Sequence, residues 1–353
     1  MKLQFKRQGR QFFFVTVAIE GRAKALSRLL DEKSRPQLLP HGETVKAALL
    51  SLHGIFPCAT LSDFVIMPDH VHFLLIADYT RDAAFNPLWV THRLMDAVEE
   101  TWNERGGSPE PPTATEMAAR IIRAMETARL RPGGLTVRPP GAAAGGFGGA
   151  APVRSPRWDR RCYIELSFDS RQLKAIRRYI RLNPARAIWK ARHPDRFVRH
   201  AAVRHPVLPT GCAWSGMGNL TLLSSPFLLH VRLTLRKSAE EHASEIATIL
   251  EKARQGFMPV CGFLSPGEKE LLRQLKAEPY ARFIRMVPHA LPPRYDPSAE
   301  DSRELAADRL LILSVFPPGT DDGIGTLRAR CLRMNDLAAA LCEKSHSLQT
   351  RQG

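Results

Sequence analysis

The spacing of hydrophobic and polar positions predicts that strands and helices alternate in the first half of the chain. The run from Phe12 to Ile19 is aromatic and β-branched and contains no breaker, which is typical of a buried strand. Residues 61–77 form two extended runs that are interrupted around Pro68. Helical spacing of apolar residues predicts helices over 44–53, 88–105 and 114–130, and a fourth helix from about residue 170 to 182, which Asn183-Pro184 ends or kinks.

The C-terminal part alternates in the same way. Strands are expected over 259–264, 281–287 and 310–316, with helices over 269–276 and 327–341. Ser265 with Pro266 and Glu268 forms a helix start directly after a strand. The free N–H groups of such a turn can bind phosphate, so nucleotide binding and a purely structural or partner-binding role both stay open.

These elements indicate an α/β (α+β) protein of two domains. We expect one domain over 1–205, a connecting region over 206–257, and an α/β domain of unknown role over 258–345. Residues 131–157 hold twelve Gly or Pro and no acid, a composition that favours a flexible basic insert within the first domain.

Charge narrows the choice of partner. The chain has 51 Lys and Arg against 35 Asp and Glu, a formal net charge of +16, which excludes an acidic disordered protein. Eleven of these cations and a single acid fall within 171–205, and a field of this size attracts polyanions such as nucleic acid. Many soluble proteins are basic without binding nucleic acid, so charge alone leaves both possibilities open.

The apolar runs and the cysteines indicate where in the cell the protein is expected. The apolar runs are far shorter than the roughly 20 residues that cross a bilayer, and the N-terminus resembles no secretory signal. We therefore expect no membrane span and a cytoplasmic location. The six cysteines are scattered without zinc-binding spacing, and we expect them to be reduced and mostly buried.

Two histidines are the first candidates for chemistry. His70 and His72 are separated by one residue in an expected strand, so both side chains project from the same face while Val71 and Phe73 point into the core. Two imidazoles placed in this way can bind one metal ion. The alternative is a pair of half-exposed histidines without a ligand.

The basic helix supplies the second candidate. Tyr179 and Asn183 are one helical turn apart on one face, and Arg178 and Arg181 flank that face. A phenol, a carboxamide and guanidinium groups would then face one anionic target. A tyrosine in a helix is also common as a core residue, and this alternative stays open.

The two motifs MPDHVHFLL and YIRLNPARA, in this order and after the strand FFFVTVAI, resemble the single-tyrosine HUH transposases, most closely the REP-associated tyrosine transposases of bacteria. The resemblance covers roughly residues 1–205. It implies a ferredoxin-like sandwich that acts on single-stranded or hairpin DNA with a divalent ion, Mg²⁺ or Mn²⁺. By this resemblance His70, His72 and Asn183 would bind the metal and Tyr179 would be the nucleophile.

The implied reaction is DNA nicking and strand transfer through a 5′-phosphotyrosine, as in transposition. A free tyrosine titrates near pH 10, so its phenol is a weak nucleophile at neutral pH. The metal would compensate by polarising the scissile phosphate. Family members differ in whether they act as homodimers with the tyrosine in the partner's site, and the sequence leaves this open. The residues expected to contact DNA phosphates are Arg177, Arg178, Arg181, Arg186 and Lys190, while Trp189 and Phe197 either stack on bases or belong to the core.

The chain departs from the family pattern between the two motifs. The family usually joins them by a compact segment, whereas residues 106–157 here add a helix and the Gly/Pro-rich insert. Two other functions therefore stay open beside transposition. One is a DNA-binding protein that keeps the fold without cleavage, and the other is a nucleotide-binding protein that acts through its C-terminal domain.

Overall fold

The computed structural model describes residues 9–105, 110–129, 155–167, 169–233, 238–316 and 326–349. The chain forms two compact units, Met1–Ala185 and Arg186–Gly353. The division lies about twenty residues before the expected domain end at 205, inside the helix α4 (Ser170–Arg192). Residues 131–154 of the Gly/Pro-rich insert lie outside the described residues.

The first unit is built on an antiparallel sheet of four strands in the order β4-β5-β1-β6. The chain runs strand, helix, strand, strand, helices, strand, with the first strand inside the sheet, which is the connectivity of the ferredoxin-like motif. The α/β class is thus confirmed, although this connectivity hosts many functions and does not identify a nuclease. The elements are β1 (Arg10–Ala18), α1 (Pro40–Ile55), β4 (Ala59–Ile66), β5 (His70–Asp78), α2 (Pro87–Arg105), α3 (Ala114–Arg129), β6 (Tyr163–Ser167), and a small pair of β2 (Ser27–Arg28) and β3 (Gln37–Leu38).

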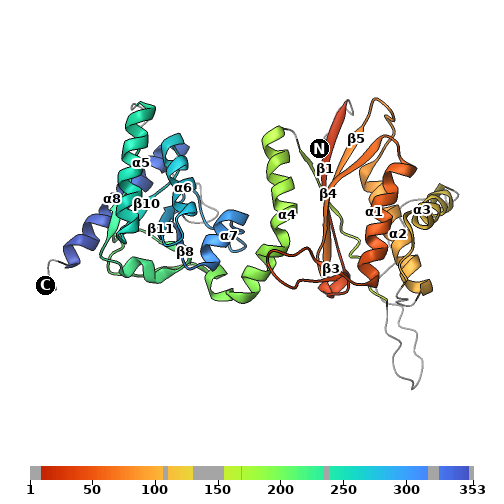
Figure 1. The fold of residues 1–353 in the computed structure, drawn as a ribbon, viewed down its shortest axis with the longest axis horizontal. Helices are drawn as coiled ribbons and strands as arrows, with labels where there is room; N and C mark the ends of the chain where they lie inside the picture. The colour runs from red at the N-terminus through yellow and green to blue at the C-terminus, as the bar shows by residue number, and fades with distance from the viewer. Residues whose placement is uncertain are drawn as a thin grey trace, which may run out of the picture. The chain divides into compact units, whose positions relative to one another are not determined.

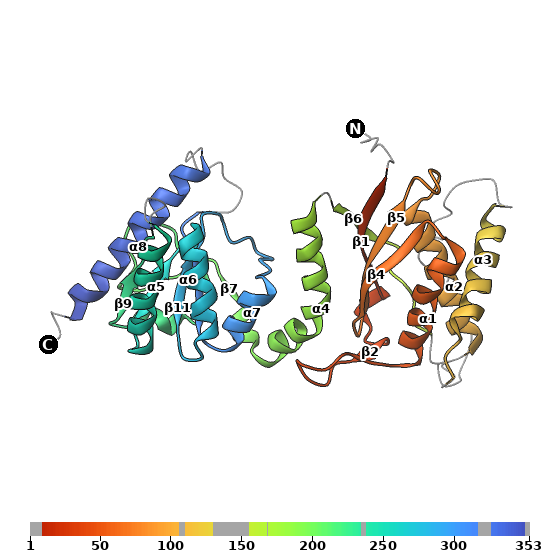
Figure 2. The same ribbon diagram turned by 45° about the horizontal axis from the view of Figure 1, so that its top comes forward.

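Helices cover both faces of this sheet. Figures 1 and 2 show α1, α2 and α3 on one face and the first part of α4 on the other. Because strand side chains alternate, Val15, Val17, Val71 and Phe73 all point into the core beneath α1 and α2. The predicted inward direction of Val71 and Phe73 is confirmed, and the opposite face of the same strands is left for α4.

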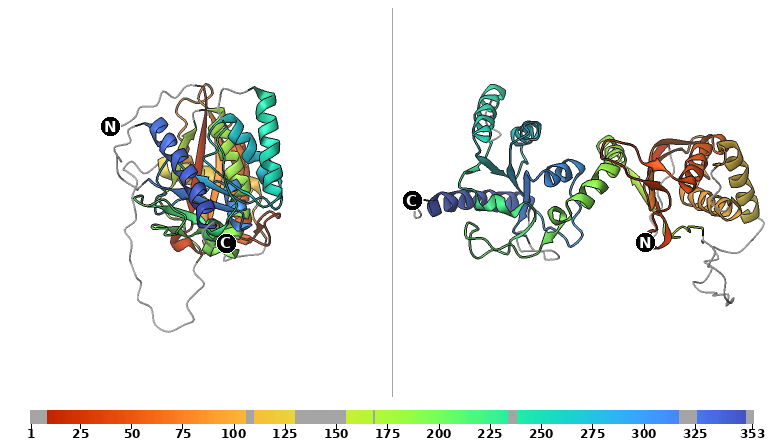
Figure 3. Two further views of the ribbon diagram at one scale, coloured as in Figure 1. Left: turned by 90° about the vertical axis from the view of Figure 1, so that its left-hand side faces the viewer. Right: turned by 60° about the horizontal axis from the view of Figure 1, so that its bottom comes forward.

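The second unit contains a sheet of six strands in the order β7-β8-β12-β11-β10-β9. The four strands β9 to β12 are parallel, and β8 and β7 continue the sheet antiparallel. Helices α5, α6 and α7 pack on one face and α8 on the other (Figure 3). The elements are β7 (Arg199–His200), β8 (Ser215–Gly218), β9 (Leu228–His230), α5 (Ala239–Arg254), β10 (Met258–Cys261), α6 (Pro266–Ala277), β11 (Phe283–Met286), α7 (Ala299–Ala306), β12 (Leu310–Ser314) and α8 (Leu327–Gln349).

The predicted elements of the second unit are confirmed near their expected positions. Residues 206–257, expected as a connection, also supply β8, β9 and α5 to this unit. The helix start at Ser265 is present, with Ser265 accepting from the N–H of Glu268. None of the helices within the described residues is long and apolar enough to cross a membrane.

The sequence predicted that Asn183-Pro184 ends or kinks helix α4, and the helix does not end there. Pro184 lies inside the helix, which continues to Arg192. A proline in a helix removes one hydrogen bond, here to the carbonyl of Ile180, and this normally weakens the helix. Ile180 is buried before this point and Ala185 and Ile188 are buried after it, and burial of apolar residues on both sides favours continuation.

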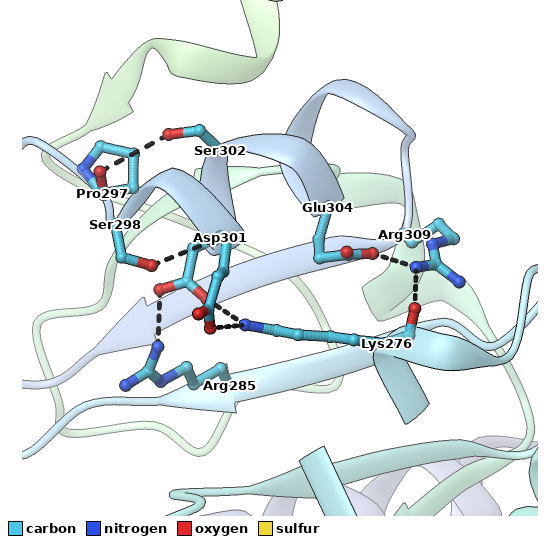
Figure 4. A network of polar contacts seen from close by, with 9 residues as sticks. Lys276, Arg285, Pro297, Ser298, Asp301, Ser302, Glu304 and Arg309 are labelled. Carbon is cyan, nitrogen blue, oxygen red and sulfur yellow. Dashed lines mark hydrogen bonds and ion pairs between the residues drawn. The ribbon is translucent and has the colours of Figure 1, made fainter. Parts of the chain in front are cut away.

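A buried carboxylate fastens α7 within the second unit (Figure 4). Asp301, only 2% exposed, accepts from Arg285 of β11 at 2.6 Å and from Lys276 of α6 at 3.1 Å. Its backbone N–H donates to Ser298, the N-cap of α7. A buried carboxylate without partners would be strongly unfavourable, so Asp301 needs both cations. Its contacts thereby connect α7 to α6 and β11.

A histidine pair beside a helical tyrosine

His70 and His72 lie on β5, opposite Ala18 and Thr16 of β1. Their Nε2 atoms are 3.1 Å apart, so both rings present this nitrogen to the same point. His72 is buried and His70 is partly exposed. The expectation that the two side chains share one face of the sheet is confirmed, and the shared face is the one that α4 covers.

The other nitrogen of each ring is held by a neighbour. Nδ1 of His70 lies 2.6 Å from Oδ1 of Asp69, and Nδ1 of His72 lies 2.7 Å from Oγ1 of Thr16. Burial raises the pKa of the Asp69 carboxyl, but the hydrogen bond with His70 and the nearby charges of His70 and Arg22 outweigh it, so the pKa lies below its usual value. Asp69 is therefore an ionised acceptor at neutral pH.

Aromatic rings enclose His72. Phe14 of β1 stacks on it with ring centres 5.3 Å apart, and Tyr179 of α4 meets it edge-on at 5.2 Å. Tyr179 also meets Phe14 edge-on at 5.9 Å. The structure therefore places Tyr179 beside the histidines of its own chain.

A buried stripe seats α4 against this face. Ile176, Ile180 and Asn183 are buried, and Tyr179 lies among them with partial exposure. These positions follow helical spacing, so Tyr179 and Asn183 share the face that meets the sheet. Within the described part of the chain, the Asn183 carboxamide makes no hydrogen bond.

Two arginines attach α4 to the sheet edge. Nε of Arg177 lies 3.1 Å from Asp63 of β4, an ion pair whose angle is not that of a hydrogen bond, and Arg181 donates to Asp63 from 3.2 Å. Arg177 also donates to the hydroxyl of Ser62 at 2.9 Å. Both arginines, expected to contact DNA, thus hold the tyrosine helix in place.

Two other expected DNA contacts belong to the second unit. Arg186 donates to Asp296 at 2.5 Å and to the carbonyl of Pro297, and Lys190 donates to Asp296 at 2.6 Å. The Arg186 side chain is only 6% exposed, so it has a structural role and is not accessible to a phosphate. Trp189 is buried, and Phe197 packs against the core of the second unit, which supports the core interpretation for both.

Exposed cations lie elsewhere on α4. Arg171, Lys174, Arg178 and Arg181 are all exposed and follow one another at intervals of three, four and three residues. This spacing places them on one face of the helix, over about 15 Å. Arg178 was expected as a DNA contact and immediately precedes Tyr179, whereas Arg171 and Lys174 were not singled out.

Thr16, Asp69 and Asp63 were not predicted as site residues from the sequence. A signal existed for two of them. Thr16 is the polar position in the apolar run FFFVTVAI, and Asp69 directly precedes the first histidine. Asp63 carries no comparable signal, because its role depends on α4 folding back over β4.

The histidine pair meets the distance requirement of a metal site. Two ligands at about 2.1 Å from one ion, at right angles or at the tetrahedral angle, are roughly 3.0 to 3.4 Å apart. The observed 3.1 Å between the Nε2 atoms lies in this range. The described residues contain no group of three or more His, Cys, Asp or Glu able to hold a metal, so further ligands would have to be Asn183, water or substrate.

The helix start at Ser265 does not offer a phosphate site. The carboxylate of Glu268 already accepts from the backbone N–H groups of Leu264 and Ser265, at 2.8 and 3.1 Å. A phosphate would have to displace this carboxylate and would meet its charge. The Glu268 side chain thus already occupies the N–H groups that a phosphate would use, and the geometry does not favour nucleotide binding there.

All six cysteines are free, and Cys58, Cys261 and Cys342 are buried. Burial raises the pKa of Cys162 and of Cys342 to about 12 in each case. These thiols remain protonated at neutral pH and are poor nucleophiles or metal ligands.

No family model matches the chain, and no curated protein is detectably similar to it. Among solved structures, the chain is similar to DNA processing protein A from Helicobacter pylori, described in a study of its single-stranded DNA binding mode. The match has 22% sequence identity and a TM-score of 0.31, and covers 42% of this chain and 67% of the other. A TM-score of 0.31 assigns neither a fold nor a function to this chain.

Proposed function

We propose that the first unit is a metal-dependent nuclease and strand transferase for single-stranded DNA, with Tyr179 as the nucleophile. The observation that carries this proposal is the joint placement of the three side chains. Two imidazole nitrogens meet 3.1 Å apart, and the ring of Tyr179 lies 5.2 Å from that of His72 in the same chain. The resemblance of the two sequence motifs to the single-tyrosine HUH transposases points to the same chemistry.

The side chains have distinct roles in the proposed reaction. His70 and His72, with Asn183 one turn beyond the tyrosine, would hold Mg²⁺ or Mn²⁺, and an ion bound there would polarise the scissile phosphate and offset the charge that develops on it. The Tyr179 oxygen attacks phosphorus and gives its proton to solvent water, and the bond from phosphorus to the 3′ oxygen breaks. That oxygen takes up a proton and leaves as a 3′-hydroxyl, while the 5′-phosphate stays on the tyrosine.

The exposed face of α4 supplies the charge for the DNA strand. Arg171, Lys174 and Arg178 are exposed on the same helix as Tyr179, and Arg178 is its neighbour in the chain, so phosphates bound here would lie on the helix that carries the nucleophile. Contacts with phosphates bind any sequence and weaken as salt displaces them. These cations therefore account for strand binding but leave the recognised sequence undefined.

Adduct formation tests the proposal. Full-length protein and its Tyr179→Phe variant are incubated with Mn²⁺ and labelled single-stranded hairpin DNAs whose loops and flanks are randomised. We expect an SDS-resistant protein–DNA adduct with wild type and none with Tyr179→Phe, while both proteins bind the DNA equally. Tyr163→Phe is the matched control, since Tyr163 is an exposed tyrosine of β6 in the same unit.

Two results would contradict the proposal. If the adduct forms in Tyr179→Phe as well, another residue is the nucleophile. If wild type binds DNA tightly and forms no adduct with any member of the pool, the first unit is a DNA-binding module without cleavage.

A further inference from the structure

The two histidines belong to a longer row of hydrogen-bonding groups. Starting at β1, Oγ1 of Thr16 lies 2.7 Å from Nδ1 of His72, and Nε2 of His72 lies 3.1 Å from Nε2 of His70. Nδ1 of His70 then lies 2.6 Å from Oδ1 of Asp69. Three successive contacts thus join a hydroxyl, two imidazoles and a carboxylate.

The carboxylate determines the direction of every bond in this row. A carboxylate can only accept, so the 2.6 Å contact with Asp69 places a proton on Nδ1 of His70, and when the ring carries this one proton its Nε2 is an acceptor. The contact between the two Nε2 atoms then requires a proton on Nε2 of His72. This leaves Nδ1 of His72 as an acceptor, and the hydroxyl of Thr16 donates to it.

Metal binding changes only one of the two rings. A metal ion needs the lone pair of both Nε2 atoms, and His70 already offers its own. His72 has to exchange tautomers: the proton on Nε2 leaves to solvent and one is taken up on Nδ1, so that no net proton is gained or lost. Nδ1–H then needs an acceptor, and the Thr16 hydroxyl can turn from donor to acceptor without moving its oxygen.

We propose that Thr16 is a positioning residue that supports both tautomers of His72, and that Asp69 fixes His70 permanently in the metal-binding tautomer. This inference rests on the metal site of the proposed function and names the residues that prepare it. Valine in place of Thr16 would remove the acceptor that the metal-bound state needs. Serine would retain it.

Asp69 is itself held from two directions. Nη1 of Arg22 lies 3.4 Å from Oδ2 of Asp69, the oxygen that His70 does not use. Arg22 has a backbone φ of 58°, a strained conformation for a residue with a side chain, in the loop after β1. The N–H of Ile19, at the start of this loop, donates to the carbonyl of Asp69 at 2.8 Å.

The test measures metal binding and the tautomer separately, with no DNA present. The dissociation constant for Mn²⁺ is obtained from the electron paramagnetic resonance signal of the free ion, for wild-type full-length protein, Thr16→Val and Thr16→Ser. Loss of such a partner of a ligating histidine typically weakens metal binding 10- to 100-fold. We expect a weakening in this range for Thr16→Val, and binding within about threefold of wild type for Thr16→Ser.

The tautomers are read from ¹⁵N resonances of labelled histidine side chains in metal-free protein, assigned with His70→Ala and His72→Ala. We expect His70 with its proton on Nδ1 and His72 with its proton on Nε2. On addition of Zn²⁺ as a diamagnetic probe, His72 should move its proton to Nδ1. The same spectra show whether Thr16→Val is folded, and Asp69→Asn, which keeps an acceptor, should bind Mn²⁺ more tightly than Asp69→Ala.

The outcomes separate this inference from the proposed function. If wild type and His70→Ala bind Mn²⁺ equally weakly, the metal site itself is refuted. If His70→Ala abolishes binding but folded Thr16→Val binds as wild type does, the metal site stands and the role of Thr16 is refuted. Finding metal-free His72 with its proton on Nδ1 would also overturn the inference.

Discussion

Removal of the Asp63 carboxylate tests whether the sheet edge positions the tyrosine helix. Asp63 is the common partner of Arg177 and Arg181, and its side chain is 15% exposed. The pair with Arg177 is partly shielded but lacks the angle of a hydrogen bond, so we assign it about 1 kcal/mol. The Arg181 side chain is 70% exposed, so its pair adds less than about 1 kcal/mol. We expect Asp63→Ala to lower the free energy of unfolding by about 1 to 2 kcal/mol.

The effect on the proposed reaction should exceed the loss of stability. In Asp63→Ala the apolar contacts of α4 remain, but the helix loses both ion pairs with β4 and keeps the hydrogen bond from Arg177 to Ser62. Small displacements of a reacting group lower rates steeply, up to about 100-fold for 1 Å. We expect the rate of adduct formation to fall at least tenfold, at a temperature where the variant is fully folded. Single-turnover kinetics with saturating DNA measure this rate apart from binding.

Asp78→Ala is the matched control. Asp78 ends the neighbouring strand β5 and also pairs with two exposed arginines, Arg10 and Arg81, at 3.5 and 3.9 Å. Its contacts do not involve α4, so Asp78→Ala should lower stability without changing the single-turnover rate. If both variants slow the reaction equally, general destabilisation explains the loss. An unchanged rate in Asp63→Ala would refute the positioning role of the carboxylate.

Three further predictions follow from the ion pairs and the exposed cations. Asp301→Ala should lower the free energy of unfolding in urea by about 3 kcal/mol, because it strands two buried or half-buried cations, whereas Glu300→Ala should cost less than about 1 kcal/mol. Replacing Arg171 and Lys174 by Ala should flatten the salt dependence of single-strand binding by about 0.7 per lost phosphate contact, and an unaltered slope would place the strand elsewhere. Arg186→Ala should destabilise the protein yet leave that slope unchanged, because its guanidinium is buried against Asp296. A flatter slope in Arg186→Ala would restore the sequence-based expectation.

Local patterns were sufficient for most elements. The strand from Phe12, the two strands around Pro68 and the helix start at Ser265 were predicted correctly, because each depends on neighbouring residues. For α4, an end or a kink was predicted at Asn183-Pro184. The end is absent, since Pro184 opposes helix formation locally and the burial of Ile180 and Ile188 overrides it. Propensity is a weak determinant where tertiary packing acts on both sides of a residue.

The same division applies to the candidate site. The period of a strand alone determined that His70 and His72 share one face, and the period of a helix determined that Tyr179 and Asn183 do. Only the tertiary structure brought these two faces together and set the rings of His72 and Tyr179 5.2 Å apart in one chain. Their separation of more than a hundred residues leaves no local pattern that relates one face to the other.

The charged residues within 171–205 show why the sequence alone does not reveal which side chains are paired. In the sequence, the cations from 171 to 205 form one basic segment, which suggests that they all bind the same polyanion. In the structure, Arg181 attaches α4 to Asp63, Arg186 is buried against Asp296, and Arg171 and Lys174 remain exposed. The sequence by itself determined the elements, their faces and the total charge. Which cations are neutralised depends on carboxylates more than a hundred residues away, and only the folding of the chain selects them.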